Sequence, residues 1–161
     1  MDERIQHAKL LYESAVFAAD EAALDTADSE LDAVEADLAL ARGRIAHGRF
    51  LQRGTEYDPE LFERALRLYR AADDLRGQAE ALFWLGIFHQ LVRRDDTTAV
   101  PSFSRSRELA AKSGDSLTLS YALRHLGIAE QRAGHLGTAR DLLEESTRLR
   151  RELGFLPGVA A

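Results

Sequence analysis

Residues 81–90 read Ala-Leu-Phe-Trp-Leu-Gly-Ile-Phe-His-Gln, and residues 122–131 read Ala-Leu-Arg-His-Leu-Gly-Ile-Ala-Glu-Gln. Six of the ten positions are identical, and Gly127 follows Gly86 by 41 residues. A weaker copy of the same stretch surrounds Gly43. Similarity at a period of 20 to 50 residues in a helical chain indicates stacked helix pairs that bury each other's apolar faces.

A second set of positions repeats with nearly the same spacing and indicates the partner helix of each pair. Each copy holds a large apolar residue, a small residue three positions later and a Leu after three more. The three copies are Phe62, Ala65 and Leu68; Phe103, Ser106 and Leu109; and Leu143, Ser146 and Leu149. The sequence therefore predicts two types of helix that alternate along the chain.

The composition favours an all-helical fold. Ala, Leu, Arg and Glu are strong helix formers, only three prolines interrupt the chain, and no stretch alternates as strands do. We expect about seven helices, near residues 3–24, 29–52, 59–73, 75–93, 98–113, 116–133 and 136–153. The predicted helix caps are Ser29, Asp58, Thr97 or Thr98, and Asp115 or Ser116.

These helices divide into one helical-repeat domain over residues 1–161. Residues 1–28 are predicted to form an acidic capping helix, 29–73 a degenerate repeat, 74–114 and 115–154 two regular repeats, and 155–161 a C-terminal stub.

The repeated pattern resembles the tetratricopeptide repeat family, in which Leu-Gly in one helix is followed by Ala-x-x-x-Phe in the next. The matching residues are Leu85-Gly86 with Ala99 and Phe103, and Leu126-Gly127 with Ala139 and Leu143. The period is 40 to 41 residues instead of 34, which is similar to repeats of bacterial regulators and signalling adaptors. Arg42 and Asp58 depart from the pattern in the first repeat. HEAT-like repeats share the longer period and are the alternative fold.

The resemblance implies a right-handed superhelix of antiparallel helix pairs, an α-solenoid whose first helices line a concave groove. It implies a non-enzymatic module that binds a protein or peptide partner there. The family's offsets predict these groove residues: Leu40, Arg44, His47, Glu80, Phe83, Ile87, Gln90, Tyr121, Arg124, Ile128 and Gln131, with Asp37 one turn further back in the first repeat. The alternative for Phe83, Ile87 and Ile128 is that they only pack between helices.

One specific binding activity of the family is disfavoured by the residues. Members that hold the carboxylate end of chaperone peptides use Lys and Asn, whereas this chain has no Asn and no Lys at the groove offsets. Arg44 and Arg124 remain able to bind a carboxylate with two hydrogen bonds.

Catalytic and metal-binding signatures are not found in the sequence. The chain has no cysteine, no phosphate-binding loop and no nucleophile-elbow motif. Its histidines show no metal-ligand spacing and are expected on the surface or at helix ends: His7, His47, His89, His125 and His135. We therefore expect no enzymatic activity, no cofactor and no metal.

The charge of the chain is unevenly distributed. Residues 1–40 hold eleven acidic and two basic side chains, so that the remainder is slightly positive while the whole chain carries −6. The chain begins without a secretory signal pattern, and its longest uncharged run has twelve residues, against about 20 for a membrane span. These features favour a cytoplasmic protein, with neither a membrane nor nucleic acid as partner.

The sequence leaves two other functions open. The chain could self-associate, as a homodimer through an exposed C-terminal repeat, or it could be the sensory part of a larger bacterial regulator. The acidic first helix is either a solvated cap or a flap over the Arg-containing groove.

Overall fold

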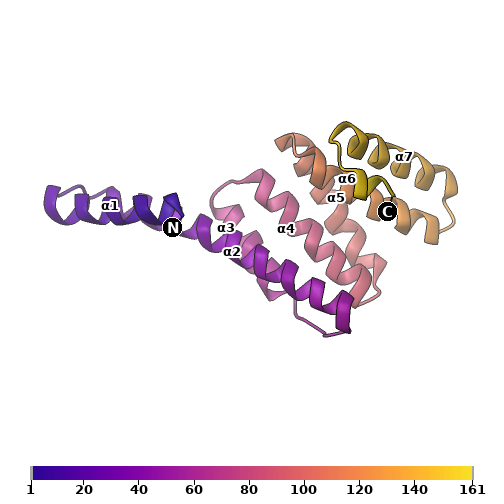
Figure 1. Cartoon of the computed structure of the whole chain (residues 1–161), viewed down its shortest axis with the longest axis horizontal. Coiled ribbons are helices and arrows are strands. Elements are labelled where there is room, and N and C mark those ends of the chain that lie inside the picture. Colours follow the sequence, from indigo (N-terminus) through magenta and orange to yellow (C-terminus); the bar gives the residue numbers. More distant parts are fainter. Residues whose placement is uncertain (1, 161) are drawn as a thin grey trace.

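The computed structural model describes residues 2–160, and these form helices joined by short connections (Figure 1). The elements are α1 (Glu3–Ala18), α2 (Ala23–Arg53), α3 (Glu60–Ala71), α4 (Leu75–Ile87), the π-helix η1 (Phe88–Val92), α5 (Asp96–Ser113), α6 (Ser116–Arg132), α7 (Leu136–Glu152) and α8 (Leu156–Ala160). No strand occurs among these residues. The all-helical prediction is confirmed, with one more α-helix than expected.

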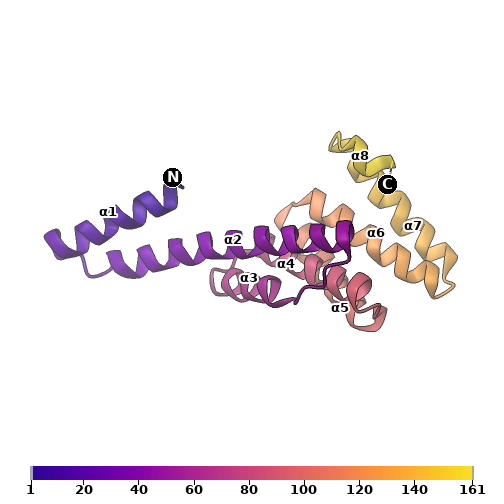
Figure 2. The ribbon, with the colours of Figure 1, turned by 60° about the horizontal axis from the view of Figure 1, so that its bottom comes forward.

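The helices stack in pairs. Each helix packs against the next one in the chain, and α4 also contacts both α2 and α6. The pairs α2/α3, α4/α5 and α6/α7 therefore form a solenoid in which α2, α4 and α6 are the first helices. Helix α1 packs against the N-terminal half of α2, and together they project from these repeats as an arm (Figure 2).

A glycine in each first helix lies against a large side chain of the second helix. A Cβ added at Gly86 would lie 2.5 Å from Cε1 of Phe103, a residue with no exposed surface. Gly43 stands in the same relation to the fully buried Phe62, and a Cβ at Gly127 would lie 2.8 Å from Cγ of Leu143. These glycines let the two backbones of each pair approach closely.

In two of the pairs, a serine of the second helix donates a hydrogen bond to the first helix of the same pair. The Ser106 hydroxyl donates a 2.7 Å hydrogen bond to the carbonyl oxygen of Ala79 in α4. One repeat later, Ser146 donates a bond of the same length to the carbonyl oxygen of Ser120 in α6. The small-residue position therefore permits close packing and also adds a buried hydrogen bond.

Aspartates begin four of the described helices. Asp2, Asp74, Asp95 and Asp115 each accept a hydrogen bond from a backbone N–H in the first turn of α1, α4, α5 or α6. The prediction that Asp115 caps α6 is confirmed. The prediction of Thr97 or Thr98 is wrong, because Asp95 accepts from both the N–H and the hydroxyl of Thr98.

Two other predicted helix starts, at Asp58 and at Ser29, are also wrong, as is the predicted end of the first helix. Asp58 makes no capping bond to α3, which begins after Pro59. The first helix ends at Ala18 and not near Leu24, and Ala19 adopts the left-handed conformation with φ 55°. The Asp20 carboxylate then accepts from the Ala22 N–H, and α2 runs from Ala23 straight through Ser29. The boundary predicted between residues 28 and 29 therefore falls inside a helix.

The predicted helix over residues 75–93 is not a continuous α-helix. It changes to the π-helix η1 after Ile87, and the Arg93 N–H donates to the Phe88 carbonyl oxygen, five residues earlier, at 3.2 Å. A π-turn is wider than an α-turn, so each residue advances less around the axis. The side chains after Ile87 are consequently rotated away from the positions that α-helical periodicity gives them.

The predicted C-terminal stub contains a short helix. Gly154 has φ 67°, close to the 72° of Gly114, and α8 follows Gly154 as α6 follows Gly114. Because the two glycines are 40 residues apart, α8 occupies the position of the first turn of a further first helix.

We expect Gly86→Ala to lower the free energy of unfolding by about 1–3 kcal/mol, because the added methyl group would displace the buried Phe103 ring. Gly48→Ala is the matched control: Gly48 lies within α2 and has no atom within 4 Å of an added Cβ, so its helix propensity should raise stability by up to about 1 kcal/mol. Urea unfolding measures both. Equal effects of the two substitutions would contradict the role assigned to the close approach.

Candidate functional site

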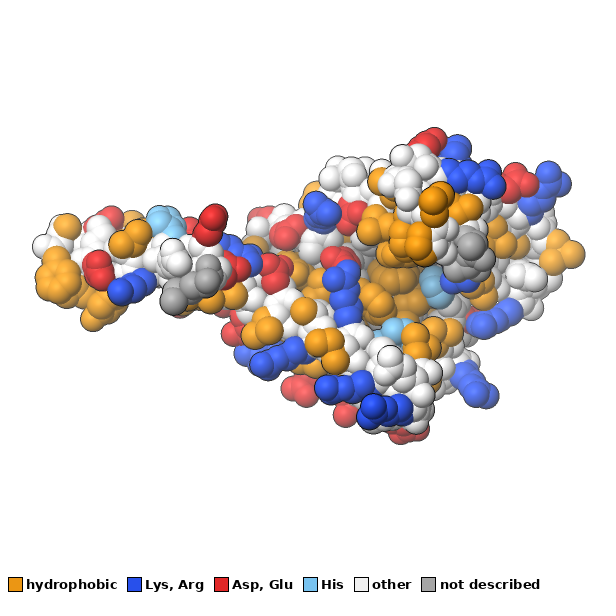
Figure 3. Space-filling model, in the orientation of Figure 1, with side chains coloured by type: hydrophobic (Ala, Val, Ile, Leu, Met, Phe, Trp, Pro, Cys, Tyr) orange, Lys and Arg blue, Asp and Glu red, His pale blue; other side chains and the backbone are white. Residues whose placement is uncertain are grey.

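A groove with a volume of about 470 Å³ crosses the first helices, between the C-terminal half of α2 and α8 (Figure 3). Helices α2, α4 and α6 each supply side chains, and the segment after α7 closes one end. The lining residues are Arg44, His47, Leu51, Phe83, Trp84, Ile87, Leu91, Leu117, Tyr121, Arg124, His125, Arg150, Phe155, Pro157 and Gly158.

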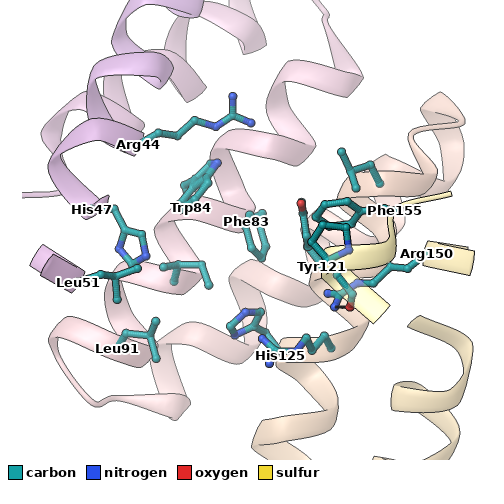
Figure 4. A pocket seen from close by; sticks show the side chains of 15 residues that line it. Arg44, His47, Leu51, Phe83, Trp84, Leu91, Tyr121, His125, Arg150 and Phe155 are labelled. Atoms are coloured by element: carbon teal, nitrogen blue, oxygen red, sulfur yellow. Dashed lines mark hydrogen bonds between the residues drawn. The ribbon is translucent and has the colours of Figure 1, made fainter. Parts of the chain in front are cut away.

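The floor and walls of the groove are aromatic (Figure 4). Phe83 of α4 stacks on Tyr121 of α6, with ring centroids 5.4 Å apart, and meets Trp84 edge-on at 5.3 Å. Phe155 contacts Tyr121 edge-on at 6.1 Å from the C-terminal side. Residues from three repeats thus form one continuous apolar surface.

Three arginines give the groove a positive potential. Arg44 forms an ion pair with Glu80 and lies over the Trp84 ring at 5.6 Å. Arg150 lies over the Tyr121 ring at 5.3 Å, and burial together with the charge of Arg124 lowers its pKa. Among the described lining residues none is Asp or Glu. The groove therefore combines apolar surface with cationic groups.

Arg150 also holds the end of the groove in place. Its side chain is buried, and Nη1 donates a 2.5 Å hydrogen bond to the carbonyl oxygen of Gly158 in α8. Nε lies 3.4 Å from the Ser120 hydroxyl oxygen. This second-helix arginine consequently links α6, α7 and α8.

His125 is neutral and belongs to a buried polar network. Burial, with the charges of Arg124 and Arg150, lowers its pKa to about 3. Its Nδ1 lies 2.6 Å from Oε1 of Gln90, while Nε2 of Gln90 donates to Asp96 at 3.0 Å. Because Gln90 uses its amide as a donor to Asp96, we assign the His125 proton to Nδ1. Nε2 of His125 is then an acceptor.

His47 is also buried, at the α2 side of the groove. Nδ1 lies 3.1 Å from the Tyr57 hydroxyl oxygen, and burial lowers the pKa of His47 and raises that of Tyr57 to about 12. The expectation that the histidines lie on the surface or at helix ends is therefore wrong for His47 and His125. Trp84 Nε1 is buried without a hydrogen-bond partner among the described residues.

The structure brings six of the predicted groove residues together in the lining: Arg44, His47, Phe83, Ile87, Tyr121 and Arg124. Leu40 is buried in the core beside Phe62, and Glu80 pairs with Arg44 without lining the groove. Ile128 is half-buried and Gln131 is exposed, and both lie outside the lining. Asp37 accepts from the Tyr69 hydroxyl at 2.8 Å and pairs with Arg4. None of the described lining residues comes from α1, so this arrangement does not place the acidic helix over the groove.

Gln90 was predicted to line the groove but is buried beneath it. It is 2% exposed, whereas Gln131, at the matching position of α6, is exposed. The π-turn of η1 accounts for the difference, because it rotates Gln90 inward and leaves Leu91 on the groove.

The sequence reasoning missed three kinds of lining residue. Trp84 and His125 each directly follow a predicted position, Phe83 or Arg124, along a first helix. Leu51 and Leu117 lie one helical turn beyond predicted positions, at His47 and Tyr121, and a wider window on the first helices would have found them. Arg150 and Phe155 lie in and after a second helix. Offsets counted along first helices alone could not indicate them.

Comparison with known proteins agrees with this architecture. Residues 77–152 match a family model described as tetratricopeptide repeat. This part of the chain belongs to the tetratricopeptide repeat family. The match spans α4 to α7, which supply most of the groove. No curated protein and no solved structure matches the chain significantly.

Tetratricopeptide repeats generally mediate protein–protein interaction, and the family typically provides scaffolds and not enzymes. Within residues 2–160, no cluster of His, Asp or Glu side chains is arranged to hold a metal ion. No helix of this described part is long and apolar enough to span a membrane.

Acidification is expected to destabilise the repeats through His125. Its folded-state pKa of about 3 is below the ordinary value of 6.5, so between these values the unfolded chain binds a proton that the folded one does not. Stability is then lost as the pH falls below 6.5, with a contribution from His125 approaching about 1.4 kcal/mol per pH unit.

The test compares urea unfolding of the wild type and His125→Asn from pH 7 to pH 4. Asn keeps an amide near the Nδ1 position but does not titrate, so the stability difference between the proteins should change with pH. Parallel stability curves would contradict the assignment.

Proposed function

We propose that the chain binds a peptide segment of a partner protein in the groove, and that this peptide combines apolar side chains with at least one carboxylate. The observation that carries the proposal is the composition of the lining: an aromatic surface built from three repeats, three arginines and, among the described lining residues, no acidic side chain.

The apolar part of the groove would provide most of the binding free energy. Its volume of about 470 Å³ lies within the range of clefts that bury a ligand. Phe83 and Ile87 line the groove but are only 5% and 3% exposed, because they also pack in the core between helices. Phe83 supports the more exposed Tyr121 by stacking, and Leu117 adds an accessible apolar side chain beside them. Preorganised aromatic side chains are common anchoring points for peptide partners because little conformational entropy is lost on binding.

The arginines would select the charge and direction of the peptide. Guanidinium groups bind carboxylates through paired, charge-assisted hydrogen bonds, which are stronger than neutral ones. Arg124 and Arg150 lie at the α6/α8 side of the groove, and Arg44 lies at the α2 side next to Glu80. A carboxylate is therefore expected to prefer the α6/α8 side, where two arginines line the groove and not one.

Selection from a random peptide library on the immobilised protein tests the proposal. The enriched peptides should contain aromatic or aliphatic residues together with Asp or Glu. Arg124→Glu should weaken their binding by about 10- to 100-fold, since a charge-assisted contact becomes a repulsion. The variant should also select basic peptides from the same library.

Arg140→Glu is the matched control for the charge change. Arg140 is exposed on α7, pairs with Glu144 at 2.8 Å and does not line the groove. Helical circular dichroism confirms that both variants fold. Peptides that bind Arg124→Glu and the wild type equally well would refute the proposed groove.

A further inference from the structure

The arm formed by α1 and the N-terminal half of α2 has its small side chains inside and its large apolar side chains outside. The buried residues between the two helices are alanines: Ala8, Ala23 and Ala27. Tyr12, Val16 and Phe17 are exposed, the last at 83% of its surface. A projecting helix pair with this distribution leaves a large apolar area in water, which is characteristic of an interaction surface.

Four large apolar residues form a straight stripe along α2. Leu24, Leu31, Leu38 and Ile45 follow each other at intervals of seven residues, and each is between 41% and 55% exposed. The stripe is about 32 Å long at 1.5 Å per residue. Val34, Ala41 and Gly48 follow three of the stripe residues three positions later, while Ala27, at the same offset from Leu24, is buried between α1 and α2. This is the spacing of a helix–helix seam in a coiled coil, with small residues beside the large ones.

Helix α1 extends the same face. His7 of α1 contacts Glu30 of α2 at 2.8 Å on one side of the arm. Ile5, Tyr12 and Val16 lie roughly 160° around α1 from His7 at 100° per residue. The stripe of α2 lies roughly 100° around its helix from Glu30. The two apolar sets therefore both point away from the side of the arm that carries the His7–Glu30 contact.

The charged residues beside the stripe are acidic along its first half and basic along its second half. Asp28, Glu35, Arg42 and Arg49 are also seven residues apart, and Glu35 in addition forms an ion pair with Arg64 of α3. Residues 25–37 of α2 contain six acidic and no basic side chains, while residues 42–53 contain four arginines and no acidic side chain. The helix is thus negative over its first half and positive over its second half.

We propose that this face binds a second copy of the chain, with the two α2 helices antiparallel. In that orientation the acidic half of each helix lies along the basic half of the other, and large residues meet the small ones. A parallel arrangement would instead place like charges together. The stripe runs over enough length for an interface of standard size, about 1,200–2,000 Å² in total.

The proposed interface is separate from the groove. His47 and Leu51 line the groove from the opposite side of α2, so both grooves of the dimer stay open. The C-terminal repeat, which the sequence suggested as a dimer surface, exposes Leu136 and Leu153 but has no seven-residue series of exposed apolar side chains among the described residues.

Sedimentation velocity over a concentration series, with light scattering for mass, tests the proposal on the full chain. The wild type should be a dimer at micromolar concentration, and Leu31→Glu with Leu38→Glu should halve its mass without loss of helical circular dichroism. Leu136→Glu, an equally drastic change on the C-terminal repeat, should remain a dimer. A monomeric wild type, or dissociation by Leu136→Glu, would overturn the proposal.

Charge reversal gives a second test, with helical circular dichroism of each variant as the check on folding because Glu35 pairs with Arg64 of α3. Asp28→Arg with Glu35→Arg makes the flank entirely positive, and Arg42→Glu with Arg49→Glu makes it entirely negative. Each variant alone should be monomeric, and an equimolar mixture should form heterodimers of twice the mass. Reversal of all four charges in one chain should restore the homodimer. If both double variants remain homodimers, the antiparallel α2 arrangement is wrong.

Discussion

Everything in this solenoid is positioned by the contact between a first-helix glycine and a large side chain of the following helix. Gly43 with Phe62, Gly86 with Phe103, and Gly127 with Leu143 set how closely the two backbones of each pair approach. That separation fixes where the next first helix can stack, because α4 must touch both α2 and α6. The concave groove exists because three first helices are brought side by side in this way, and its aromatic floor is built on the same helices.

The architecture was predictable because the residues that form the helix–helix contacts recur at a fixed spacing in the sequence. The 41-residue interval between Gly86 and Gly127 identified the helix pairs, and the glycine offsets identified six residues that line the groove. What could not be predicted depends on local backbone choices and on contacts from other helices. A left-handed Ala19, a π-turn after Ile87 and the hydrogen bond from Arg150 to Gly158 have no repeated signature. Each of them changes which side chains face the groove or where a helix begins.

The net charge of −6 is the sum of regions with opposite character. The acidic residues gather between residues 20 and 37, in the connection after α1 and the first half of α2, whereas the groove lining is cationic in its described residues. Separation of this kind lets one helix, α2, contribute to two surfaces with different electrostatic preferences. Its groove side carries Arg44 and His47, and its opposite side carries the stripe from Leu24 to Ile45. A single long helix can thus belong both to the repeats and to the arm.

The pairing of each helix mainly with its sequence neighbours has a consequence for local opening. In such a quasi-one-dimensional array, cooperative unfolding units lie one after another, and those at the ends are held from one side only. Amide hydrogen exchange should therefore be slowest in α4 to α6, and faster in the alanine-lined arm and in α8. The floor of the groove is formed by α4 and α6, which should exchange slowly, and one end of the groove is formed by α8, which should exchange faster. A ligand that touches both would slow exchange at the C-terminal end without any rearrangement of the central helices.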